Sequence, residues 1–128
     1  MLFRSALRPG KPVMVGTLGG AVTLGLPGNP VSAFVTALLF LRPLIAALSG
    51  ASEPLPEPEA ATLGAHLPAN GERLDFVRAH FVEGRVEAVG TSDSAALRAL
   101  SLATALIIRQ PNASAAIQGE IVDIIRTA

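Results

Sequence analysis

The chain begins with a pattern of short apolar runs. Residues 12–16 and 21–26 are rich in β-branched and other apolar side chains, and the residues between them include Gly19 and Gly20. Two such runs joined by a short glycine-containing segment predict a β-hairpin. Both strands are apolar at successive positions, which is typical of strands covered on both faces. We therefore expect a buried hairpin near the start of the chain.

A nearly continuous apolar run follows the hairpin and predicts a helix over residues 30–49. Asn29 is suited to its N-cap, Pro30 to its first turn and Gly50 to its C-cap. The run carries a single charge, Arg42, and approaches the length of a membrane span. However, a proline follows Arg42, and small and hydroxyl residues dilute the hydrophobicity. We therefore favour a buried helix, with a membrane span as the alternative.

Residues 60–128 alternate between polar and apolar side chains over several short stretches. The alternation predicts strands, and over residues 74–82 and 85–89 it predicts a hairpin with one solvated face. Together with one segment of helical spacing, it indicates a small all-β barrel or sandwich with one helix. The predicted strands are 60–67, 74–82, 85–89, 105–109 and 120–125, and the predicted helix is 94–103.

A proline-rich segment separates the two patterns. Residues 52–59 alternate three prolines with acidic residues, a composition typical of a stiff connector. We therefore expect a first segment over residues 1–51 and a second over residues 60–128. Two strands and one apolar helix cannot close a core. The first segment should accordingly expose an apolar surface that packs on absent chain, on a partner subunit or on its own copies, and the isolated chain should self-associate.

Composition and charge exclude several classes of function. The 128 residues carry 10 basic and 10 acidic side chains and no cysteine. A net charge of zero argues against nucleic-acid binding. The absence of cysteine excludes disulfides, thiolate nucleophiles and cysteine-ligated metals, and His66 and His80 do not make a metal site by themselves. The first residues contain no signal-peptide core, so we expect a cytoplasmic protein.

The segment Pro27-Gly28-Asn29-Pro30 is the first candidate for chemistry. Glycine lets the backbone approach a ligand, and the start of a helix attracts oxyanions through its unpaired N–H groups. Ser32 lies in the first helical turn, where its hydroxyl adds a donor. The same residues also make an ordinary turn and helix cap without any ligand, and this interpretation stays open.

A second candidate turn contains two cations, in the sequence Arg-Pro-Gly-Lys-Pro at residues 8–12. Its Lys11 is the single lysine of the chain. A compact cation beside a helix start suits a phosphate or another tetrahedral oxyanion, and a solvated turn charge is the alternative. Elsewhere, Asp75 and Arg78 are three positions apart on a predicted strand and should point to opposite faces, which argues against a catalytic dyad.

Taken in order, these motifs resemble the C-terminal part of the molybdopterin molybdenumtransferases, the MoeA and gephyrin E-domain family. The motifs are Arg-Pro-Gly-Lys-Pro at 8–12, Gly-Leu-Pro-Gly-Asn-Pro-Val-Ser-Ala at 25–33, Leu-Arg-Pro at 41–43 and Gly-Glu-Arg-Leu-Asp-Phe-Val-Arg at 71–78. The resemblance covers nearly the whole chain. It implies that residues 1–51 are the end of a three-layer α/β molybdopterin-binding domain and that residues 60–128 are a C-terminal β-barrel domain.

The resemblance also implies a function. The family inserts molybdate into adenylylated molybdopterin with Mg²⁺ and releases AMP, as a step of molybdenum cofactor biosynthesis. It implies that Lys11 and Ser32 act in catalysis. Because the family's magnesium ligands and catalytic acid lie upstream, we expect no metal ligand in this chain and little activity of the chain alone. The residues expected to contact the pterin and its phosphate are Arg8, Gly10, Pro27, Gly28, Asn29 and Pro30.

Partners follow from the same resemblance. It implies a homodimer in the full-length form and molybdopterin adenylyltransferase as a partner in the same pathway. Neither nucleic acid nor membrane is expected. A non-catalytic scaffold or interaction module of the gephyrin kind is the alternative from another class of function.

Overall fold

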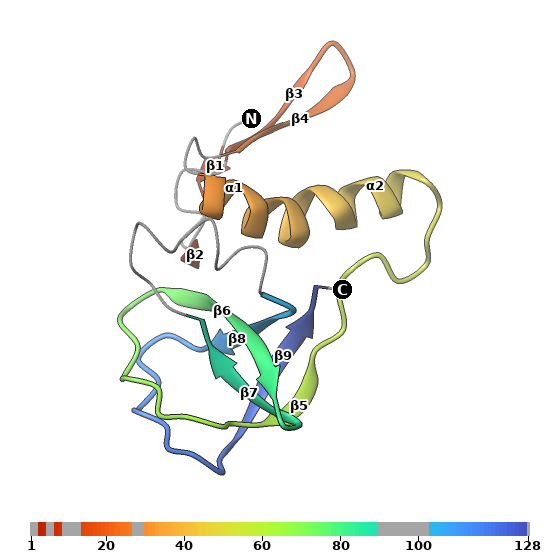
Figure 1. Ribbon diagram of the computed structural model, residues 1–128. Helices are drawn as coiled ribbons and strands as arrows, with labels where there is room; N and C mark the ends of the chain where they lie inside the picture. Colours follow the sequence, from red (N-terminus) through yellow and green to blue (C-terminus); the bar gives the residue numbers. More distant parts are fainter. Residues whose placement is uncertain (1–2, 5–6, 9–13, 27–29, 90–102, 128) are drawn as a thin grey trace. The chain divides into compact units, whose positions relative to one another are not determined.

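A computed structural model describes residues 3–4, 7–8, 14–26, 30–89 and 103–127 (Figure 1). The chain divides into two compact units, Met1–Pro56 and Glu57–Ala128. The long helix belongs to the first unit.

The sheet of the first unit contains the predicted hairpin. Its strands are β1 (Phe3–Arg4), β3 (Met14–Leu18) and β4 (Ala21–Gly25). Neighbouring strands are antiparallel and follow the order β1-β3-β4. A further short strand, β2 (Leu7–Arg8), lies between β1 and β3 in the sequence. Leu18 pairs with Ala21, so Gly19 and Gly20 alone form the turn. Both glycines have positive φ, +56° and +84°, as the two-residue turn that matches strand twist requires. The first strand therefore continues two residues beyond its predicted end at residue 16.

The predicted helix is continuous but changes its hydrogen-bonding pattern in the middle. It consists of α1 (Pro30–Thr36), the π-helical turn η1 (Ala37–Leu41) and α2 (Arg42–Leu48). Pro43 explains the change, because a proline inside an α-helix has no N–H to donate and its ring clashes with the carbonyl four residues earlier. In the wider turn, the N–H of Arg42 donates to the carbonyl oxygen of Ala37, five residues back.

The helix ends at the predicted glycine. Gly50 has a φ of +91°, and its N–H donates to the carbonyl oxygen of Ala47 at 3.1 Å. The N–H of Ala51 donates to the carbonyl oxygen of Ala46 at 3.0 Å. These two bonds satisfy carbonyl groups at the helix end and form a Schellman motif. Within the described residues, no helix is long and apolar enough to cross a membrane.

The second unit is a curled antiparallel sheet, a half-barrel (Figure 1). Its order along the sheet is β7-β6-β8-β9-β5. Directly after β5 in the sequence, Leu63 forms a parallel bridge with Val86 of β7, and the Gly64 N–H donates to the Val86 carbonyl oxygen at 2.8 Å. This contact links the two ends of the strand order. The strands are β5 (Glu59–Thr62), β6 (Leu74–Val82), β7 (Arg85–Ala88), β8 (Ala105–Arg109) and β9 (Ile121–Arg126).

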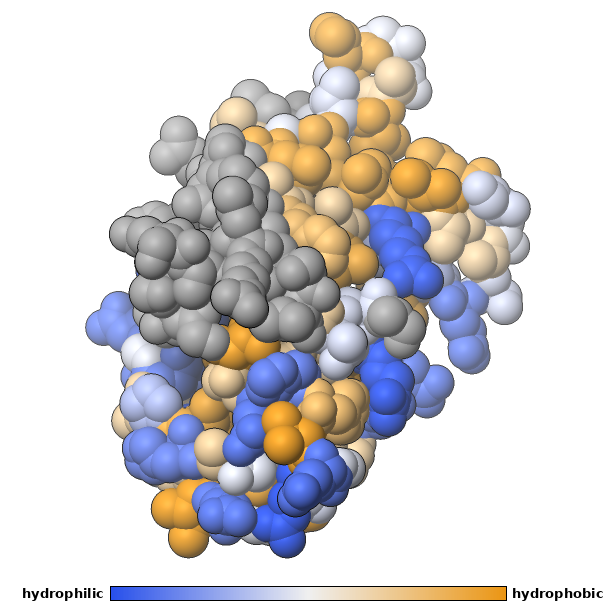
Figure 2. Space-filling model, in the orientation of Figure 1, coloured by the Kyte–Doolittle hydropathy of each residue, from blue (hydrophilic) through white to orange (hydrophobic). Residues whose placement is uncertain are grey.

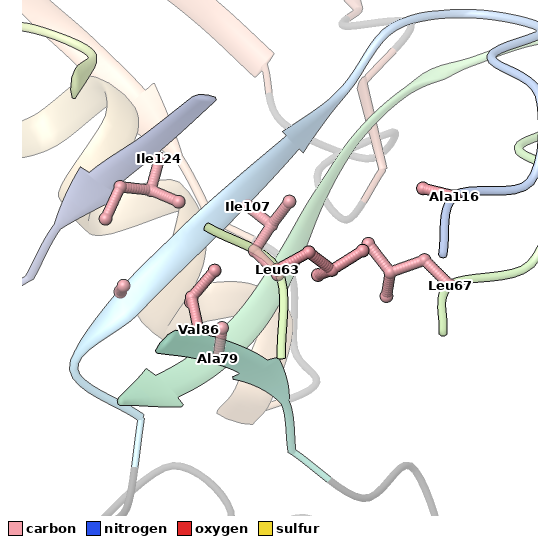
Figure 3. Close-up of a cluster of buried hydrophobic side chains, with 8 residues drawn as sticks. Leu63, Leu67, Ala79, Val86, Ile107, Ala116 and Ile124 are labelled. Carbon is pink, nitrogen blue, oxygen red and sulfur yellow. The ribbon is translucent and has the colours of Figure 1, made fainter. Parts of the chain in front are cut away.

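One hydrophobic cluster fills the inside of the curled sheet (Figure 3). Alternate residues of each strand point to the same face, so β6, β8 and β9 each contribute inward side chains. The cluster comprises Leu63, Leu67, Ala79, Val86, Ala105, Ile107, Ala116 and Ile124. Leu106 of β8, which lies between Ala105 and Ile107 of this cluster, is also fully buried. The strand is therefore covered on both faces at this position, as its successive apolar residues allow.

The remaining sequence predictions differ from the structure at their ends. The weak strand predicted over residues 60–67 is regular only as far as Thr62, and Leu67 instead forms an isolated bridge with Ala116. Glu59, the last residue of the predicted connector, already belongs to β5, where its carboxylate accepts a hydrogen bond from Nε of Arg126 at 2.6 Å. The predicted helix over 94–103 lies outside the described residues, apart from residue 103.

Candidate functional site

The predicted site residues fall into two groups. Arg8 ends β2, and Pro30 and Ser32 lie in the first turn of α1. The others lie outside the described residues, and their roles stay predictions. These are Gly10, Lys11, Pro27, Gly28 and Asn29.

The register of the first sheet connects the two candidate turns. β3 begins at Met14, directly after the segment that contains Lys11, and β4 ends at Gly25, shortly before Pro27. Met14 and Gly25 are cross-strand partners. Both candidate segments therefore leave the sheet from the same end, which the sequence alone could not establish. β1 also ends there, because Arg4 is the partner of Met14.

The start of α1, which follows β4 in the sequence, carries a positive electrostatic potential that attracts negative charge. α1 begins at Pro30, and the first N–H groups of a helix lack partners inside the helix and carry a partial positive charge. The first turn contains no acidic residue, so no carboxylate of the helix itself competes for these donors. Such a helix start favours an oxyanion.

The second unit places a guanidinium group in an unusual position. Arg78 lies on β6 opposite Leu106, and its Nη1 atom is buried without a hydrogen-bond partner in the described part of the chain. A buried donor without an acceptor costs about 1–3 kcal/mol, and more when it is charged. An oxygen atom of a bound anion would satisfy this donor. Sequence reasoning did not assign this role, since it used Arg78 only as part of a motif and in the argument against a dyad with Asp75.

Two neighbouring polar side chains hold the loops of the second unit. Arg109 lies opposite Asp75 in the register, and its Nη2 donates to the carbonyl oxygens of Pro68 at 3.0 Å and Ser114 at 2.8 Å. Both Asp75 and Arg109 are buried, with 9% and 8% exposure. Arg109 therefore ties two loops together from inside the sheet. Asp75 and Arg78 have different cross-strand partners on β8, Arg109 and Leu106.

Asn70 completes this arrangement at the loop before β6. Its Nδ2 donates to the carbonyl oxygens of Arg73, Arg109 and Gln110 at 2.9, 3.1 and 2.8 Å. One side-chain amide thus joins the start of β6 to the end of β8. This loop has a structural explanation that needs no ligand.

Metal ligands do not gather in the described residues, where no group of three or more His, Asp or Glu side chains could hold an ion. His66 is exposed, and His80 lies on β6 opposite Glu87.

The helix of the first unit carries a shallow apolar groove of about 260 Å³ (Figure 2). Ile45 and Leu48 are 55% and 71% exposed, which confirms the expected apolar surface. The groove contains one cation, Arg42, and is otherwise unsuited to an oxyanion. Its lining residues are Phe34, Ala37, Leu38, Leu41, Arg42 and Ile45.

Comparison with known proteins identifies the class of this fold. Residues 60–126 match the model of the MoeA C-terminal region (domain IV). The molybdopterin biosynthesis MoeA protein from Pyrococcus horikosii has the same fold, with a TM-score of 0.79 and 22% sequence identity over 96% of this chain and 31% of that chain. This structural likeness concerns the fold alone.

Curated relatives support the same family. A molybdopterin molybdenumtransferase from Haemophilus influenzae is 38% identical over 89 residues, which are 66% of this chain and 22% of the relative. Molybdopterin molybdenumtransferase 2 from Mycobacterium tuberculosis is 36% identical over 104 residues, which are 80% of this chain and 26% of the relative. The chain belongs to the MoeA family, as its motifs indicated, and spans about a quarter of the length of these relatives.

Proposed function

We propose that the chain acts in molybdenum cofactor biosynthesis, as part of a transferase that inserts molybdate into adenylylated molybdopterin and releases AMP. One geometric observation supports this proposal most directly, the pairing of Met14 with Gly25. The segments that contain Lys11 and Gly28 both leave the sheet beside this pair, and α1 begins shortly after it. The names of the two bacterial relatives, both molybdopterin molybdenumtransferases, support transfer of molybdenum to molybdopterin.

The chemistry of the reaction suits these residue types. Molybdate and the phosphate groups of the adenylylated substrate are oxyanions, and negative charge must be neutralised while the adenylate leaves. Lys11 and Arg8 supply positive charge for that purpose, and the Ser32 hydroxyl donates a hydrogen bond beside the N–H groups of the helix start. Gly10 and Gly28 allow the backbone to approach the substrate closely.

The conformation of the turn before the helix has its own role in this proposal. We propose that Pro27 and Pro30 restrict the backbone on either side of Gly28 and that Asn29 caps the helix. A turn held in one conformation presents its N–H groups without reorganisation when the charge develops. The turn thus binds and orients the substrate, while Lys11 and Ser32 act on the reacting groups.

In this proposal the magnesium ligands lie in a part of the enzyme outside these 128 residues. When bound, the ion supplies charge neutralisation at the phosphate oxygens. The chain alone is therefore expected to have little or no activity, and the complete enzyme is expected to act as a homodimer in the cytoplasm.

Arg78 is a separate candidate contact for an anion, within the second unit. Its buried Nη1 lacks a partner in the described part of the chain, and a guanidinium group donates well to phosphate and other oxyanions. We propose that it binds an anion at the second unit. An arginine that served the fold alone would be expected to have its buried donors satisfied, as those of Arg109 are.

A chimeric enzyme tests the proposal. These 128 residues replace the matching part of the Haemophilus influenzae relative, and molybdate-dependent release of AMP from adenylylated molybdopterin is measured. The chimera should be active, and Lys11→Ala or Ser32→Ala should each lower the rate about ten- to a hundredfold, the loss of one charge-assisted contact. Arg85→Ala, at an exposed position on β7, is the matched control and should not change the rate.

The outcomes separate the two classes of function. A folded chimera that releases no AMP would refute the catalytic proposal and favour the non-catalytic scaffold. Equal rates for Lys11→Ala, Ser32→Ala and the control would assign a structural role to both turns, even in an active chimera. Thermal unfolding of each variant is measured alongside, so that a loss of activity is not confused with a loss of the fold.

A further inference from the structure

No further inference is drawn: the strongest candidate, the apolar groove along the Pro30–Leu48 helix lined by Phe34, Leu38 and Ile45, is an unpartnered face, and nothing in the described part of the structure shows what covers it.

Discussion

Replacing Gly64 with alanine tests how the curled sheet joins its two ends. A Cβ atom at this position would lie 2.9 Å from Cγ of Glu87 and 3.1 Å from Cβ of Arg85. The Glu87 side chain can rotate away, but Cβ of Arg85 is fixed by the backbone of β7. The backbone at Gly64 must therefore move away from the backbone of β7, and the 2.8 Å hydrogen bond from the Gly64 N–H to the carbonyl oxygen of Val86 must lengthen.

The magnitude follows from these contacts. Overpacking at a close approach costs about 1–3 kcal/mol, and one lengthened hydrogen bond contributes about 0.5–1.5 kcal/mol at most. We expect Gly64→Ala to lower the free energy of unfolding by about 2 kcal/mol, and the melting temperature by roughly 8–16 °C for a unit of this size.

Gly71→Ala is the matched control, because a Cβ atom there would have no atom within 4 Å and the backbone is not left-handed. Alanine restricts the unfolded chain, so this variant should be unchanged or more stable by about 0.4–1 kcal/mol. Urea unfolding followed by far-ultraviolet circular dichroism measures both, since the chain contains no tryptophan or tyrosine. The reasoning is refuted if Gly64→Ala is as stable as the wild type or as Gly71→Ala.

Three other changes test the remaining features. Arg109→Met removes the tie between two loops and the cation opposite buried Asp75, so urea unfolding should show a loss of about 3 kcal/mol; a loss below about 1 kcal/mol would contradict this role. Arg78→Leu should leave the free energy of unfolding of the second unit no lower, but it should reduce any thermal stabilisation of that unit by molybdate or phosphate. An unchanged stabilisation of the second unit in this variant would count against an anion contact at Arg78. Ile45→Glu combined with Leu48→Glu should reduce the binding of a hydrophobic dye and the self-association seen in light scattering. Dye binding as strong as that of the wild type would mean that the apolar surface responsible lies elsewhere.

Local elements could be predicted because their causes lie within a few residues. The apolar run 105–109 has the same bounds as β8, and two adjacent glycines formed the turn of the first hairpin. The π-helical turn before Pro43 could not be predicted in the same way. A proline within an apolar helix is compatible with a kink, a helix end or a wider turn, and the apolar periodicity does not distinguish them.

The candidate site was predictable in part, through its motifs. The two turns could be selected from residue types. That both segments leave the sheet at the same end depends on the pairing of Met14 with Gly25. Contacts between distant strands were beyond the sequence patterns, as the pairing of Asp75 with Arg109 illustrates. The buried, unpartnered nitrogen of Arg78 likewise depends on tertiary packing, which no local pattern contains.

The strand order of the second unit has a consequence for its synthesis. β5 is the first strand of the unit to leave the ribosome, yet its antiparallel partner is β9, with Glu59 opposite Ile124. β9 also pairs with β8, so it lies between two strands that are made before it. Neither β5 nor β8 can complete its strand pairing until residues 121–126 have emerged. The unit should therefore fold after translation of this segment rather than progressively during it, and a nascent chain that stalls before Ile121 should be recognised by chaperones or proteases as unfolded.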